Sequence, residues 1–210
     1  MSQSDIPKKK SATPPLILAS ASRSRRRMLE NAGIPCLCEA ADLDEGIIKN
    51  TMIDQGARPS EISEKLAIEK ALVISQKYPK NIILGGDQLL VCEGRIFDKP
   101  RNLAEAKDHL LFFRGKAHCL HTSYALVKGQ KVLFCETICP QLTMRNFSEE
   151  FLEDYIEKSG EKILNSVGCY LLEDRGSQLF SDINGNYFAI LGLPLLNVME
   201  NLRKLKCLKI

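Results

Sequence analysis

The chain has 210 residues, 44% hydrophobic and 26% charged, and its 29 basic and 26 acidic residues give a formal net charge of +3. This size and balance are typical of one globular domain with a substantial core, or of two small ones. A nucleic-acid-binding domain is usually strongly basic, and no apolar stretch approaches the roughly 18 residues of a membrane span. Composition therefore argues against nucleic acids and membranes as partners.

The first residues are polar, and we expect residues 1–14 to form a disordered tail before a single domain over residues 15–205. The run "KKK" followed by "LILA" imitates a secretory signal, but its apolar part is far shorter than the roughly 7–15 residues required. The eight cysteines contain no C-x-x-C pattern. Without an export signal they are expected to be reduced thiols, which predicts a cytoplasmic protein.

The predicted elements of the first half begin with a short buried strand, Leu16–Ala19, and a helix that Ser22 or Ser24 caps and that runs to Asn31. A strand over 35–40, a long polar connection over 41–60 and a helix over 61–77 capped by Ser60 follow. Next come a buried strand over 81–86 that ends in two glycines, a hairpin over 88–97, and a helix over 103–113 capped by Asn102.

Long strands are predicted in the second half, where residues 117–127 and 132–145 form one hairpin. Ser148 caps a helix that ends at Gly160, and short strands are expected over 167–172, 178–180 and 187–191. Pro194 begins the closing helix. Because helices and strands alternate, we predict an α/β domain with a mixed sheet.

Asp87 is the strongest candidate for chemistry, because it follows a predicted strand and two glycines. Ligands of α/β sheets bind beyond the carboxyl ends of strands, and Gly85 and Gly86 would let a ligand approach the backbone. The hairpin returns Lys99 toward Asp87. A carboxylate beside a lysine suits phosphoryl chemistry, although a strand-end acid and a solvated loop lysine are the plainer interpretation.

Further candidates have equally plain alternatives. Asp44 and Glu45 lie in the predicted connection, where acids are usually solvated. Lys70 lies beside the apolar stripe of its helix, as a snorkelling lysine would, and Glu173 follows an apolar run. In "HCLH", His118 and His121 would point to opposite faces of a strand, so a metal site is not expected there.

Several nucleotide and hydrolase motifs are missing from the sequence. No G-x-x-x-x-G-K-[ST], no G-x-G-x-x-G after a strand and no G-x-S-x-G is present. The sequence therefore argues against a Walker-type ATPase, a Rossmann dehydrogenase and an α/β hydrolase.

Six segments appear in an order that resembles the Maf family of nucleoside triphosphate pyrophosphatases. They are "LASAS…RRRMLENAG", "LAIEKA", "GGDQ", "GRIFDKP", "SVGCYLLED" and "INGNYFAILGLPL". The resemblance implies one α/β domain, inosine-triphosphatase-like and often dimeric, with a curved mixed sheet and a deep nucleotide cleft. It implies hydrolysis between the α and β phosphates, giving a monophosphate and pyrophosphate with Mg²⁺ or Mn²⁺.

The resemblance also assigns roles to individual residues. Asp87 matches the proposed general base and, with Glu45, the metal-binding acids. The residues that match phosphate-binding positions are Ser20, Ser22, Arg25, Lys70 and Lys99. A helix start preceded by small hydroxyl residues is a natural anion site, and Arg25 can add a bidentate contact, whereas Arg26 and Arg27 are expected to face solvent.

Three positions matter for the base. Gln88 and Glu173 resemble the branch that acts on 7-methyl-GTP rather than the branch that acts on dTTP and UTP. Ser24 departs from both, because it stands where the family has an arginine or a tryptophan. The resemblance therefore favours a methylated guanine nucleotide as substrate, without the stacking tryptophan.

A second hypothesis is a non-catalytic nucleotide- or nucleic-acid-binding regulator of cell division, a role to which members of this family have been linked. It predicts nucleotide affinity without turnover. The intact set of acids and lysines argues against it, because a pure binder needs no positioned base.

Overall fold

The computed structural model describes residues 16–209, so the expected tail over residues 1–14 lies outside them. The strands are β1 (Leu16–Ala19), β2 (Cys36–Cys38), β3 (Ile82–Cys92), β4 (Arg95–Phe97), β5 (Ala117–Lys128), β6 (Lys131–Ile138), β7 (Gln141–Met144) and β8 (Phe180–Asn184). The helices are α1 (Arg23–Asn31), α2 (Glu45–Asp54), α3 (Pro59–Lys77), α4 (Leu103–Phe113), α5 (Glu149–Ser159), α6 (Tyr187–Ile190) and α7 (Leu195–Lys204), with 3₁₀ turns η1 (Gly160–Asn165) and η2 (Arg175–Leu179).

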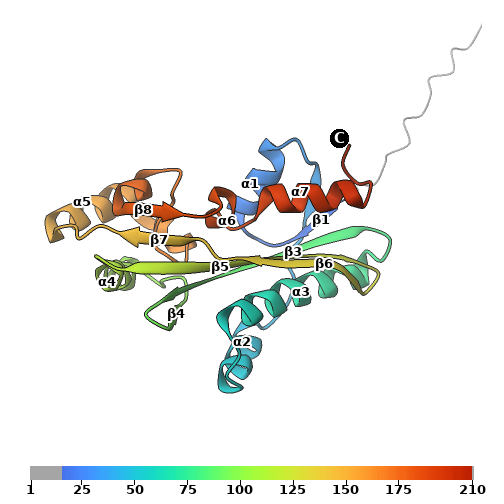
Figure 1. Ribbon diagram of the computed structural model, residues 1–210, viewed down its shortest axis with the longest axis horizontal. Helices are drawn as coiled ribbons and strands as arrows, with labels where there is room; N and C mark the ends of the chain where they lie inside the picture. The colour runs from blue at the N-terminus through green and yellow to red at the C-terminus, as the bar shows by residue number, and fades with distance from the viewer. Residues whose placement is uncertain (1–15, 210) are drawn as a thin grey trace, which may run out of the picture.

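Within this part of the chain, eight strands form one mixed sheet in the order β2-β1-β3-β5-β7-β8, with β4 paired to β3 and β6 to β5. The β1 strand pairs in parallel with β2 and β3, and the other pairs are antiparallel. Figure 1 shows α1 and α7 on one side of the sheet and α3 on the other, with α2 beyond α3. The predicted α/β domain with a mixed sheet is confirmed.

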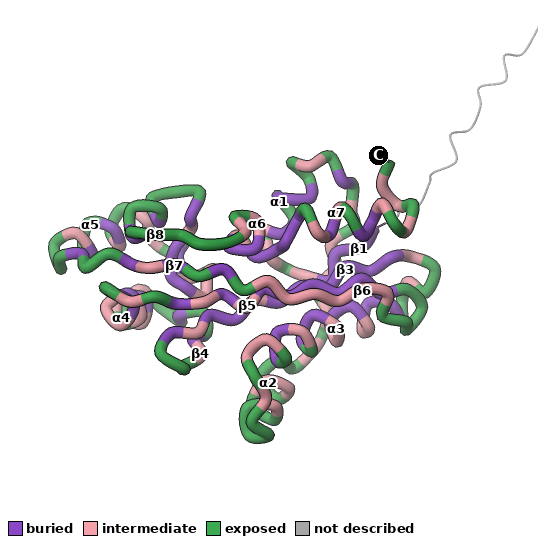
Figure 2. The backbone as a smooth tube through the Cα atoms, viewed as in Figure 1, coloured by how far each residue is buried: buried purple, intermediate pink, exposed green. Residues whose placement is uncertain are grey.

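The central strands are covered on both faces, and Figure 2 shows β1, β3 and β5 as the buried middle of the molecule. Leu16 and Leu18 belong to the core cluster beneath α1 and α7. Ile17 and Ala19 belong to the cluster beneath α3. Burial on both faces explains why β1 is continuously apolar in sequence.

The predicted end of the third strand at Gly86 is wrong, because β3 continues to Cys92. Its antiparallel partner β5 pairs with it from Ile83↔Val127 to Val91↔Cys119. The parallel partner β1 stops at Ala19, opposite Gly85. From Asp87 onward, β3 therefore has no β1 neighbour. The site lies at the carboxyl end of β1, and not at the carboxyl end of β3 as predicted.

The predicted polar connection over 41–60 is also wrong in part, because it contains α2. The Asp44 side chain caps this helix by accepting a hydrogen bond from the Ile47 amide at 3.0 Å. No residue of α2 is fully buried. Only Ile48 and Met52, one helical turn apart, pack against the core, so the apolar stripe of this helix is short and was missed. The next helix begins at Pro59 rather than after Ser60, consistent with the preference of proline for the first helical position.

Two predicted strands in the last third are not strands. Residues 167–172 form turns, in which Cys169 has a φ of 58°, and Tyr187–Ile190 is the helix α6, whose cap Asn186 accepts from the Ala189 amide. The strand predicted over 178–180 begins two residues later, at Phe180, because η2 occupies Arg175–Leu179. The second hairpin strand is split into β6 and β7 around Pro140, which has no amide hydrogen to donate.

Candidate functional site

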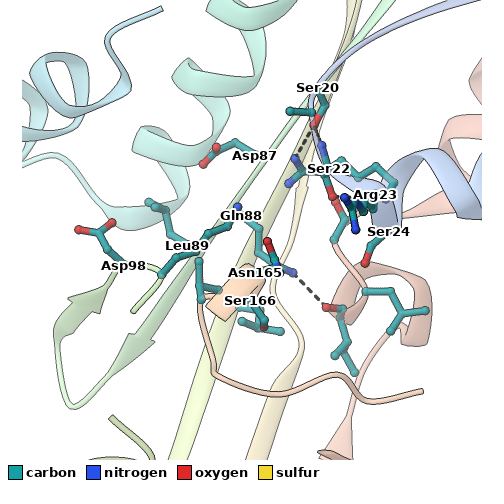
Figure 3. Close-up of a pocket in the computed structure, with 18 of the residues that line it drawn as sticks. Ser20, Ser22, Arg23, Ser24, Asp87, Gln88, Leu89, Asp98, Asn165 and Ser166 are labelled. Atoms are coloured by element: carbon teal, nitrogen blue, oxygen red, sulfur yellow. Dashed lines mark hydrogen bonds between the residues drawn. The ribbon is translucent and has the colours of Figure 1, made fainter. Parts of the chain in front are cut away.

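A cleft of about 800 Å³ opens at the end of β1, beside β3. Its lining includes all ten predicted site residues: Ser20, Ser22, Ser24, Arg25, Glu45, Lys70, Asp87, Gln88, Lys99 and Glu173. Figure 3 shows Asp87 and Gln88 projecting from opposite sides of β3, with Ser20 and Ser22 at the adjoining turn. The fold thus brings together residues that are up to 153 positions apart in the chain.

The turn between β1 and α1 is arranged around Arg25. Ser22 caps the helix, its Oγ accepting from the Arg25 amide at 3.4 Å, and Ser20 Oγ accepts from the Ser22 amide at 3.2 Å. The Arg25 guanidinium donates from Nε to Gly192 O at 2.7 Å and from Nη1 to Ser20 Oγ at 3.1 Å. Arg25 is therefore fixed at a helix N-terminus that already attracts anions.

The other arginines of this segment behave as predicted. Arg26 is exposed and pairs with Glu30 one turn along the helix, while Arg27 is exposed. Only Arg25 of these three is buried, and burial lowers its pKa while Asp87 and Glu45 act in the opposite direction.

Gly85 and Gly86 make room for the protein itself, which corrects the expectation that they admit a ligand. A Cβ at Gly85 would lie 2.0 Å from the carbonyl oxygen of Ala67 on α3. A Cβ at Gly86 would lie 3.1 Å from Arg25 Nε. The first glycine lets α3 pack on the sheet, and the second lets the guanidinium cross the strand.

Lys70, Asp87 and Glu45 form a charged cluster. Lys70 Nζ lies 2.7 Å from Asp87 Oδ1 and 2.7 Å from Glu45 Oε2. Lys70 and Asp87 are 8% and 6% exposed. Asp87 Oδ2 is buried and has no hydrogen-bond partner within residues 16–209. A buried carboxylate oxygen is normally satisfied, so a water molecule or a cation is the partner that this atom lacks.

Lys99 completes the positive charge on the cleft wall. Burial lowers its pKa, and repulsion from Arg25 and Lys70 lowers it further, while Glu45 and Asp87 oppose the shift. The cleft lining therefore holds five cations and four carboxylates (Arg23, Arg25, Lys49, Lys70 and Lys99; Glu45, Asp87, Asp98 and Glu173), and it favours a polyanion that neutralises the excess.

A divalent cation fits the donor set at this cluster. The described residues contain no group of three His, Cys, Asp or Glu side chains that would hold a metal by themselves. Mg²⁺ is usually bound by one or two carboxylates together with substrate phosphates and water. Glu45 and the unpartnered oxygen of Asp87 are a set of that kind.

The three candidates for nucleobase selection are Gln88, Ser24 and Glu173, and they differ in their surroundings. Gln88 Nε2 donates to Thr122 Oγ1 at 2.8 Å and to Ala189 O at 2.9 Å, with Ile190 O at 3.2 Å. Ser24 is half-buried and Glu173 is exposed. Gln88 therefore ties α6 to the sheet, and its Nε2 is already used within the protein.

Sequence reasoning missed several lining residues: Arg23, Lys49, Asp98, Asn165, Ser166 and Tyr170. Lys49 was hidden because its helix was predicted as a connection, yet it stands four residues after Glu45, one helical turn away. Asp98 directly precedes Lys99. His118 is buried, and its Nε2 lies 2.8 Å from the Tyr170 hydroxyl.

The fold and the site define a class: an α/β protein with an anion-binding cleft that holds a buried carboxylate among lysines and an arginine. The family model of Maf-like protein matches residues 15–205, and the chain belongs to that family.

Relatives support the same assignment over nearly the whole chain. A nucleoside triphosphate pyrophosphatase of Granulibacter bethesdensis is 49% identical over 195 residues, covering 93% of this chain and 99% of the relative. A protein of the same name from Paramagnetospirillum magneticum is 42% identical, covering 90% and 97%. A 7-methyl-GTP pyrophosphatase of Rhizobium johnstonii is 40% identical, covering 92% and 97%.

Proposed function

We propose that this protein is a nucleoside triphosphate pyrophosphatase that hydrolyses the bond between the α and β phosphates and releases a monophosphate and pyrophosphate. One observation carries the proposal. Asp87 is buried, its Oδ1 is held by Lys70 and its Oδ2 lacks a hydrogen-bond partner in the described chain, in a cleft lined by Arg25 and Lys99. The names of the relatives agree with this chemistry.

We assign each of these residues a role in an in-line displacement at phosphorus. Asp87 Oδ2 would accept a proton from the attacking water or orient it. Lys70, Lys99 and Arg25 would offset the charge on the phosphates, which is the main demand of phosphoryl transfer. The α1 N-terminus with Ser20 and Ser22 would hold phosphate oxygens. A divalent cation, Mg²⁺ or Mn²⁺, held by Glu45 and Asp87, would further neutralise the phosphate chain.

For the base, we propose selection by Glu173, Gln88 and Ser24, with guanine nucleotides including 7-methyl-GTP as the favoured class. Glu173 is exposed at the cleft and can accept hydrogen bonds from the N–H groups of a guanine edge. Gln88 shapes the floor through its bonds to Thr122 and Ala189. The names of the relatives include both the general and the 7-methyl-GTP activity.

Two further proposals concern the setting of the enzyme. All eight cysteines are free thiols, which supports a reducing cytoplasm as the compartment. No helix within residues 16–209 is long and apolar enough to cross a membrane. A homodimer stays a prediction, which light scattering on the purified chain tests.

The decisive experiment measures pyrophosphate release from 7-methyl-GTP, GTP, dTTP and UTP with Mg²⁺ or Mn²⁺. We expect turnover by the wild-type chain and its loss in Asp87→Asn. Nucleotide binding that is unaffected by Asp87→Asn, with no turnover of any substrate by the wild-type chain, would instead support a non-catalytic binding protein.

A further inference from the structure

Helix α2 presents two opposite charges to the cleft, one turn apart. Glu45 and Lys49 are four residues apart, a spacing that places side chains on one face of a helix, and both line the cleft. Glu45 contacts Lys70 on α3. Lys49 Nζ contacts both carboxylate oxygens of Asp98, in the loop after β4, at 2.5 and 2.6 Å. The helix thus adds a cation to the cleft wall that the proposed chemistry has not used.

The ion pair between Lys49 and Asp98 is asymmetric. The Lys49 side chain is 16% exposed, whereas the Asp98 side chain is 70% exposed. The ammonium is therefore confined at the cleft, while its partner is mostly in water. A pair with so exposed an acid contributes little to the stability of the fold, so a stronger anion can replace Asp98 at little cost. Phosphate oxygens form such charge-assisted bonds with lysine.

We propose that Lys49 is a further phosphate-binding residue, and that Asp98 is an internal anion that occupies its ammonium when no phosphate is bound. The proposal rests on the proposed function for the nature of the anion, a polyphosphate. Lys49 would exchange Asp98 for a phosphate oxygen as the nucleotide enters, and would return to Asp98 as pyrophosphate leaves.

A purely structural role of the pair makes a different prediction. In that case the bond between Lys49 and Asp98 would only help the packing of Ile48 and Met52 against the core to hold α2 in place. Loss of either partner would then loosen α2 in the same way, and both variants would impair the site alike. Competition for one ammonium instead gives the two variants opposite effects on phosphate binding.

The experiment compares Lys49→Met with Asp98→Asn in the full-length protein. Steady-state kinetics gives KM and kcat for the best nucleotide, and calorimetry with inorganic pyrophosphate and Mg²⁺ gives a Kd without turnover. We expect Lys49→Met to raise KM and Kd roughly ten-fold or more, as loss of a charged hydrogen bond does, with kcat nearly unchanged. Asp98→Asn should lower both constants roughly two- to five-fold.

Three further variants make the comparison strict. Asp98→Asn should bring no gain in a Lys49→Met background, because the ammonium that it frees is gone. Lys49→Arg, which keeps the charge, should bind pyrophosphate more tightly than Lys49→Met if both fold. Lys116→Met removes a matched ion pair, with Glu93 at 2.7 Å, outside the cleft lining, and should leave KM and Kd unchanged.

Two results would overturn the proposal: a rise of KM and Kd in Asp98→Asn like that in Lys49→Met, or no change of either constant in Lys49→Met. Absence of pyrophosphate binding by the wild-type chain would overturn it too. Failure of the proposed function has a distinct signature, because a wild-type chain without turnover would still show the opposite shifts in pyrophosphate Kd.

Discussion

Asp87 and Gln88 are neighbours on β3, but the groups that hold them differ in kind. Asp87 is buried beside the Lys70 ammonium, and one of its oxygens has no hydrogen-bond partner within residues 16–209. Gln88 is held by the hydroxyl of Thr122 and the carbonyl of Ala189, and its Nε2 is satisfied. On the Asp87 side of the strand, a charged group is only partly paired within the described residues. On the Gln88 side, a neutral amide is hydrogen-bonded to other groups of the protein.

This difference suggests that the two sides of β3 have different roles: the Asp87 side in the chemical step, and the Gln88 side in selection of the nucleobase. A buried charge that is only partly compensated is costly to the fold, so its presence is best explained by the chemistry that it serves. Neutral groups that bond one another contribute to shape and stability in any case. Substitutions on the Asp87 side should therefore change kcat, whereas substitutions on the Gln88 side should change the preference among bases.

The largest effect is expected from Asp87→Asn. The amide cannot accept a proton from water, so kcat should fall roughly 10²- to 10⁴-fold, the usual contribution of a general base. The measurement is pyrophosphate release under saturating nucleotide, with thermal unfolding to show that the fold is intact. Glu69→Gln, an acid on α3 paired with Lys65, is the matched control and should keep full activity. If Asp87→Asn retained activity near the wild-type level, Asp87 would not be the general base.

The next largest effects are expected from alanine substitutions at the two glycines of β3. One substitution should impair substrate binding and the other should destabilise the fold. Gly86→Ala places a Cβ 3.1 Å from Arg25 Nε, so it should displace the guanidinium and raise KM roughly ten-fold, as loss of a charged contact does. Gly85→Ala places a Cβ 2.0 Å from a backbone oxygen of α3 and should destabilise the fold by roughly 1–3 kcal/mol or more. Denaturant unfolding and kinetics on both variants distinguish the two outcomes.

Equal losses of stability in both variants, with unchanged KM in Gly86→Ala, would contradict the role given to Arg25. The comparison is informative because both substitutions add one methyl group to the same strand.

The sequence predicted which residues lie together in the cleft better than it predicted the elements around them. Asp87, Lys70 and Lys99 were selected together because each lies in one of the ordered segments that resemble the family, whereas each residue alone had a plainer interpretation. The end of β3 was misplaced because two glycines resemble a strand break, whereas here they admit a helix backbone and a guanidinium. Periodicity reports burial, and α2 packs only Ile48 and Met52 against the core and buries no residue fully, so this helix was missed and with it the placement of Lys49.

The third prediction concerns the proposed selection of the base. Glu173→Gln removes a charged acceptor at the cleft rim, so the ratio of kcat/KM for 7-methyl-GTP to that for UTP should fall roughly ten-fold. The thermal midpoint should not change, because Glu173 is exposed. Glu157→Gln, an exposed acid of α5 outside the cleft lining, should leave the ratio unchanged. An unaltered ratio in Glu173→Gln would exclude this residue from base selection.

The smallest effect is expected in the pH profile, and it tests the charged side of β3 by a different route. Burial, with repulsion from Arg25 and Lys70, lowers the pKa of Lys99 from the ordinary value of 10.5. The protonated form is the one that attracts phosphate, and it is lost as the pH rises through this lowered pKa. The alkaline limb of kcat/KM, which reports the free enzyme, should therefore begin below the ordinary lysine range.

Lys99→Arg should move that limb to higher pH, because the guanidinium stays protonated throughout the accessible range. At alkaline pH the variant should retain more of its neutral-pH activity than the wild type, because Lys99 loses its charge as the pH rises through its lowered pKa and the guanidinium does not. Lys116→Arg, outside the cleft lining, should leave the limb in place. If Lys99→Arg also left it in place, the limb would belong to another group, and Lys99 would act on the phosphates without controlling the pH dependence.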